Sequence, residues 1–112
     1  MEVIWFLRIC FSIVLISMLV VTSWASLQGG PVWAIPRAIG THPWFIATLF
    51  DTYFAFLTFF AWLAYKEASW LRSSLWLVLI LLLGNIAMAT YMLIQLFRVP
   101  ANARLEDILL RK

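Results

Sequence analysis

The sequence is poor in the residues that build reactive centres. Of its 112 residues, one is a cysteine, one is a histidine and only 12% are charged. A single cysteine, Cys10, excludes an intramolecular disulfide and a metal site made of several cysteine ligands. The patterns G-x-S-x-G and H-E-x-x-H and a glycine-rich phosphate loop are also absent. These absences disfavour an enzyme, so we expect no catalytic residues and no metal.

Charged residues are also too scarce for a soluble domain. Soluble domains contain about 25% charged residues, whereas 65% of this chain is hydrophobic. The net charge of +3 comes without a basic stripe with interleaved aromatic residues, so a nucleic-acid partner is not expected. The composition instead predicts a single all-α domain, residues 1–112, embedded in a lipid bilayer.

Three apolar runs are long enough to cross a membrane, because about 20 helical residues span its hydrocarbon core. They cover about residues 3–27, 44–65 and 75–97, and tryptophans lie near their ends, as in the aromatic belts of membrane proteins. The short polar connection 66–74 would make the second and third runs antiparallel neighbours. The sequence therefore predicts an integral membrane three-helix bundle. A cleaved signal peptide remains an alternative for the first run.

The segments outside these runs have distinct compositions. Prolines interrupt residues 28–43, yet the segment is apolar, which indicates a loop lying in the membrane interface. Residues 100–112 form a short amphipathic pattern, with Leu105, Ile108 and Leu109 on one helical face. Three spans would place this loop and the C-terminal tail on the same side. Their basic residues favour the cytoplasmic side for the tail.

Asp51 is the exceptional residue of the second run, since a charge at the bilayer centre costs about 2.5–3.5 kcal/mol. With the third run antiparallel to the second, polar side chains of the three runs would gather toward one leaflet. The predicted intramembrane polar cluster comprises Asp51, Thr48, Asn85, Thr90, Tyr91 and Gln95. Small residues on the same faces, Ala47, Ala55, Gly84 and Ala87, predict close helix packing. Asp51 either fixes this packing or binds a ligand, proton or cation.

His42, the only histidine, precedes the proline that begins the second run. We interpret it first as a hydrogen-bonding group at the start of a helix. The alternative is that it ligates a metal or a pigment at the membrane interface, although one histidine alone is a poor metal site.

Three stretches carry a family resemblance: Pro43-Trp44-Phe45-x-Ala47-Thr48-Leu49-x-Asp51-x-Tyr53, then Trp62-x-Ala64-Tyr65-Lys66-Glu67, then Leu83-Gly84-Asn85-Ile86-Ala87. The chain through Phe97 resembles small bacterial and plant integral membrane proteins that share a domain of unknown function. The resemblance implies a membrane fold of about three spans. It marks Asp51, Tyr53, Lys66 and Glu67 as motif positions and implies no activity.

Together these features predict an accessory or assembly subunit of a larger membrane complex. Its expected partners are the bilayer and other membrane-protein subunits, or further copies of itself. The first alternative is binding of a small molecule, proton or cation around Asp51, including transport by an oligomer. The second is a pigment-associated subunit with His42 as the ligand. Bound lipid is expected, and no cofactor otherwise.

Overall fold

The computed structural model describes residues 3–110, apart from the side chain of Val32. All regular structure in this part of the chain is helical, which confirms the all-α prediction. The elements are α1 (Val3–Gly29), the short 3-10 helix η1 (Val32–Ala34), α2 (Arg37–Gly40), α3 (Pro43–Glu67), α4 (Trp70–Leu83), α5 (Asn85–Phe97) and α6 (Leu105–Leu109).

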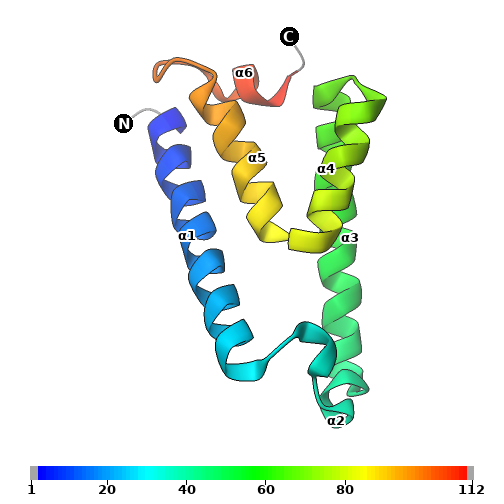
Figure 1. Ribbon diagram of the computed structural model, residues 1–112. Helices are drawn as coiled ribbons and strands as arrows, with labels where there is room; N and C mark the ends of the chain where they lie inside the picture. The colour runs from blue at the N-terminus through cyan, green and yellow to red at the C-terminus, as the bar shows by residue number, and fades with distance from the viewer. Residues whose placement is uncertain (1–2, 111–112) are drawn as a thin grey trace.

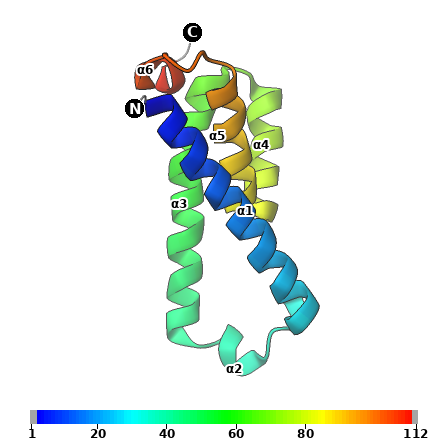
Figure 2. The same ribbon diagram turned by 90° about the vertical axis from the view of Figure 1, so that its left-hand side faces the viewer.

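α1 and α3 are the two long helices and run along the length of the molecule (Figure 1). They contain 27 and 25 residues. At 1.5 Å per residue, helices of this size are about 38–40 Å long, which exceeds the roughly 30 Å hydrocarbon core of a bilayer. Both are also apolar enough to cross a membrane. The segment containing η1 and α2 joins them at one end (Figure 2).

The start of α3 follows from its first residues. Pro43 occupies the beginning of the helix, where a missing N–H is harmless. The Nδ1 atom of His42 accepts a hydrogen bond from the backbone N–H of Trp44 at 3.2 Å. The expected role of His42 at the helix start is therefore present in the structure.

The third apolar run is not one helix, and our prediction of a continuous span over 75–97 is wrong. The chain turns back at Gly84, which has φ 60° and ψ −124°, so that α4 and α5 form a helical hairpin (Figure 1). This positive φ favours glycine, and a Cβ atom here would lie 2.8 Å from Cζ of Phe56. The hairpin helices contain 14 and 13 residues. Each is therefore about 20 Å long, too short to span.

The hairpin changes where the C-terminal tail lies. α5 runs parallel to α3, and α6 therefore lies at the end of the molecule where α1 begins, opposite α2 (Figures 1 and 2). The expectation that the tail and the loop of residues 28–43 share one side is wrong for this reason. The amphipathic pattern in residues 100–112 forms only the five-residue α6, and residues 111 and 112 lie outside the described residues.

The core is concentrated in the half of the molecule that contains the hairpin. One cluster joins α3, α4 and α5, and a second joins α1, α5 and α6. At the centre of the first, the buried Tyr91 ring contacts Phe59, Trp62 and Trp76 edge-on, with centroid separations of 6.1, 5.7 and 4.9 Å. Such aromatic pairs add about 0.5–1.5 kcal/mol each to the burial of their surface. The two clusters together fix α5 between α1 and the α3–α4 pair.

Candidate functional site

Asp51 lies in the half of α3 that is nearer α2, where the side chain is exposed in the single chain. Thr48, one turn earlier, is also exposed, and its hydroxyl donates to the backbone carbonyl of Trp44 at 2.8 Å. On α5, the hydroxyl of Thr90 donates to the carbonyl of Ile86 at 2.7 Å. Both threonines therefore bond to their own helix.

The remaining predicted cluster residues lie elsewhere along the hairpin. Asn85 is exposed at its elbow, whereas Tyr91 and Gln95 are buried further along α5, toward the opposite end of the molecule. No hydrogen bond among residues 3–110 joins Asp51 to any of them. The reversal at Gly84 is the reason, because it inverts the direction of α5 on which the predicted depths depended.

The small residues predicted to pack helices divide in the same way. Gly84 lies against the ring of Phe56, and Ala87 is buried in the core. Ala47 and Ala55 are exposed on α3 beside Asp51. Of these four residues, only the two in the hairpin pack closely within the part of the chain that the structure describes.

At the opposite end, a buried arginine joins α1 to the end of α5. Nε and Nη2 of Arg8 donate to the carbonyl of Leu96 at 3.3 and 3.0 Å, and Nη2 donates to that of Val99 at 2.9 Å. The guanidinium also lies over the rings of Trp5 and Phe97, 4.9 and 4.5 Å from their centroids. It supplies donors and positive charge to carbonyls that a helix end leaves unsatisfied.

The last two turns of α3 hold the C-terminal tail. Nε1 of Trp62 donates to the carbonyl of Leu109 at 2.9 Å, and Nζ of Lys66 donates to that of Leu110 at 2.7 Å. The neighbouring Glu67 accepts a hydrogen bond from the Tyr91 hydroxyl at 3.1 Å. The tail therefore docks on the chain itself, and two motif positions, Lys66 and Glu67, make contacts that the sequence did not predict.

These elements enclose a hollow of about 340 Å³, which we call the polar-end hollow. Its lining residues come from α3, α4, α5 and the tail: Lys66, Glu67, Arg72, Gln95, Arg98, Val99 and Asp107. Three of these side chains are cationic and two are anionic. Such a lining can bind an anion and a cation side by side. Sequence reasoning missed this set, because its members meet only through the hairpin and the returning tail.

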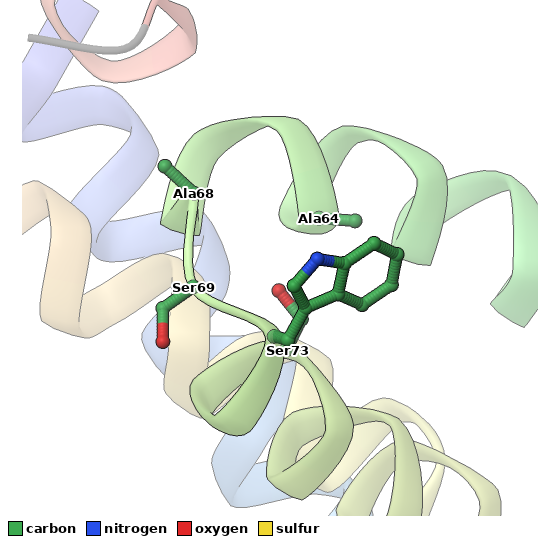
Figure 3. Close-up of a pocket in the computed structure, with 5 residues that line it drawn as sticks. Ala64, Ala68, Ser69 and Ser73 are labelled. Carbon is green, nitrogen blue, oxygen red and sulfur yellow. The ribbon is translucent and has the colours of Figure 1, made fainter.

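Two other hollows are chemically poorer. One of about 260 Å³ lies at the α3–α4 turn, where Ala64, Ala68, Ser69 and Ser73 surround it (Figure 3). The Ser69 hydroxyl already accepts from the backbone N–H of Arg72 at 3.4 Å, as a helix cap. The other, of about 370 Å³, lies between the end of α1 and the following loop, with no charged residue in its lining. The polar-end hollow is therefore the stronger candidate.

Metal chemistry finds no support among the described residues, where no group of three or more His, Cys, Asp and Glu side chains is arranged to hold an ion. Nδ1 of His42 already accepts a hydrogen bond at the start of α3, so in the neutral ring the proton is on the other nitrogen, which is a donor and offers no lone pair to a metal. A pigment at this position stays a prediction.

Comparison with known proteins agrees with the family resemblance. No curated protein and no solved structure matches the chain. A family model does match, over residues 2–112, and its description is a protein of unknown function. This confirms the expected membership of a domain-of-unknown-function family. Because the match covers almost the whole sequence, the chain belongs to the family of proteins of unknown function DUF1475.

Proposed function

We propose that this protein is an integral membrane protein that acts as an accessory or assembly subunit of a larger membrane complex. In this proposal α1 and α3 cross the bilayer, while the α4–α5 hairpin enters from one side and turns back at Gly84. The low burial of both long helices supports this proposal, since only 11% of an apolar 18-residue stretch in each helix is buried. The core helix of a soluble protein would be mostly covered.

The contacts of α1 support its retention in the mature fold rather than its removal as a signal peptide. Ile4 is fully buried in the core cluster with Met92 and Leu96 of α5. Arg8 bonds to the carbonyl of Leu96 in the same helix. Loss of α1 would leave this face of α5 bare.

The distribution of basic residues supports one orientation. Arg8, Lys66, Arg72, Arg98 and Arg104 lie at the end with the tail, whereas Arg37 lies at the α2 end. Cytoplasmic segments of membrane proteins are enriched in Lys and Arg. We therefore propose that the C-terminal tail is cytoplasmic, as the sequence favoured. The hairpin changes which basic residues lie on the same side as the tail.

The exposed carboxylate of Asp51 is the observation that carries the assembly proposal. Asp51 lies about 12 Å along α3 from its first residue, among exposed apolar side chains such as Phe50 and Phe54. A charged group at such a depth in lipid is costly and usually faces a protein partner or a cavity. No group of this chain bonds to it within the described residues, so a partner that supplies the donor would remove the cost.

The surroundings of Asp51 suit a helix–helix contact. Ala47, Thr48, Ala55 and Thr58 share its side of α3 and are exposed; we call this surface the Asp51 face. Small residues let two helices approach closely, and polar groups can hydrogen-bond across the contact. We propose that a helix of another membrane subunit packs here.

Photo-crosslinking in the native membrane tests this proposal. A photoreactive residue at Ala55, on the Asp51 face, is expected to yield a discrete crosslinked product, and Asp51→Asn is expected to weaken it. The matched control is Leu49, an exposed position on the opposite side of α3, which should yield none. Equal crosslinking at both positions, or a monomer that purifies in mild detergent without any partner, would contradict the proposal.

The alternative function, binding of a small molecule, proton or cation at Asp51, uses the same exposed carboxylate. Because this chain does not enclose Asp51, such a site requires an oligomer. Titrating the purified oligomer with protons or cations distinguishes this alternative from the assembly role. If Asp51→Asn abolishes binding while the oligomer persists, the alternative is favoured.

A further inference from the structure

We infer that the polar-end hollow binds the phosphoethanolamine headgroup of a membrane phospholipid. Arg72 and Arg98 hold the phosphate, and Glu67 accepts the primary ammonium. The inference rests on the membrane location proposed above but not on the contact at the Asp51 face. It assigns a ligand class to the other end of the molecule.

The two arginines provide the phosphate site. Arg72 extends from the first turn of α4, and Arg98 ends α5, so that two helices bring both guanidiniums to the same hollow. Neither guanidinium makes a hydrogen bond or ion pair within residues 3–110. The lining has three cationic side chains and two anionic ones, so it keeps one excess positive charge that a bound phosphate would offset. The planar guanidinium donates two parallel hydrogen bonds to phosphate oxygens.

Glu67 provides the complementary charge. Its Oε2 atom accepts from the hydroxyl of Tyr91, which is 1% exposed and held by the aromatic cluster. This bond orients the carboxylate at the wall of the hollow and leaves acceptor capacity, because a carboxylate offers about four lone-pair sites. A primary ammonium has three N–H donors to fill them. A choline headgroup has none, so the site discriminates between the two.

The surface beside the hollow suits acyl chains. Leu75 and Leu79 follow Arg72 on the same face of α4, since residues three or four apart are neighbours on a helix. They are 58% and 40% exposed. Ile94 is similarly exposed one turn before Arg98 on α5. This arrangement, charged at the helix ends and apolar below, favours a lipid over free phosphoethanolamine.

The volume is large enough to admit a headgroup. Small-molecule pockets commonly measure about 300–1,000 Å³, and the polar-end hollow, at about 340 Å³, is at the lower end of this range. The headgroup would fit within the hollow, with room for bridging water, while the acyl chains remain outside along α4 and α5.

Native mass spectrometry of the full-length protein tests the inference. The protein is purified in mild detergent and offered equal amounts of dioleoyl phosphatidylethanolamine, phosphatidylcholine and phosphatidylglycerol. We expect phosphatidylethanolamine to be retained about tenfold over phosphatidylcholine, the ratio that corresponds to about 1.4 kcal/mol. The double variant Arg72→Gln with Arg98→Gln should lose about tenfold in binding of all three lipids.

Two further variants separate the parts of the site. Glu67→Gln keeps an oxygen for the Tyr91 hydroxyl but removes the negative charge, so preference for phosphatidylethanolamine over phosphatidylcholine should disappear while phosphate binding remains. Arg37→Gln, at the α2 end, is the matched control and should bind lipid as the parent does. Circular dichroism melting in the same detergent identifies any variant that has lost its fold.

The outcomes are distinct. Equal retention of the three lipids, or unchanged binding by the double arginine variant, overturns the inference. Displacement of lipid by an equal concentration of free phosphoethanolamine overturns the lipid source. Release of the chain from membranes by alkaline carbonate instead refutes the proposed membrane function. A chain that resists carbonate but shows no lipid selectivity refutes this inference alone.

Discussion

Arg8 illustrates at the scale of one residue how a charge within an apolar helix is accommodated. It is 8% exposed, yet three hydrogen bonds to backbone carbonyls and two aromatic rings surround its guanidinium. In the sequence, Arg8 lies five residues into an apolar run. This position fits a buried side chain that bonds within the protein, but it equally fits a side chain that extends to the lipid headgroups. The end of α5 decides between the two.

Arg8→Met should destabilise the protein by about 1.5–3 kcal/mol, the usual contribution of hydrogen bonds to a charged group. The variant leaves the carbonyls of Leu96 and Val99 without their donors, whereas Arg8→Lys keeps the charge and should lose less. Unfolding in mixed micelles measures the change. Arg37→Met, at an exposed position, is the control. A melting curve for Arg8→Met that overlays the parent's would show that the bonds contribute nothing.

At the scale of elements, the α4–α5 hairpin shows which helices the sequence could predict and which it could not. Residues 3–27 and 44–65 were correctly expected to be helical, because apolar length is a property of the sequence itself. The same criterion failed over 75–97, where hydropathy continues through Gly84 but the backbone does not. The dipeptide Gly84-Asn85 in the middle of the run was the available signal.

Gly84→Ala should destabilise the hairpin by about 1–3 kcal/mol, as expected for a non-glycine residue forced into a sparsely populated conformation. The added Cβ would also meet the Phe56 ring at 2.8 Å. Gly40→Ala is a suitable control, since an added Cβ there meets nothing within 4 Å. The measurement is again unfolding in micelles.

Combining Gly84→Ala with Phe56→Leu divides the two causes. In the Phe56→Leu background the added Cβ no longer meets the ring, so Gly84→Ala should cost less stability there than in the parent protein. The cost that remains in that background measures the strain of the backbone. Equal stability of Gly84→Ala and Gly40→Ala would argue for a continuous helix through this position.

At the scale of the whole molecule, the direction of α5 determined which site residues could be foreseen. The predicted cluster around Asp51 assumed that Thr90 and Tyr91 lie at its depth, with Gln95 nearer the same membrane surface. Reversal of the chain moves Tyr91 and Gln95 toward the other end. The polar-end hollow was not foreseeable from spacing, because Arg72, Arg98 and Asp107 belong to different elements.

The hairpin makes a topological prediction that a third span would not. In a Cys10→Ser background, cysteines at Asn102 and Thr41 should react with an impermeant maleimide from opposite faces of oriented vesicles. Both positions are exposed, and they lie at the tail end and the α2 end respectively. If both cysteines react from the same face, the result would support a third span over residues 75–97 and contradict the hairpin.

The hairpin also gives the protein an uneven cross-section. The hairpin lies beside one end of the two long helices (Figure 1). If α1 and α3 cross a bilayer as proposed, α4 and α5 would add their volume to one leaflet only, and the other leaflet would surround only α1 and α3. Such a wedge pushes lipids apart on its thick side and leaves packing voids on its thin side. A membrane crowded with this protein would therefore bend toward the thin side unless another subunit filled the missing volume.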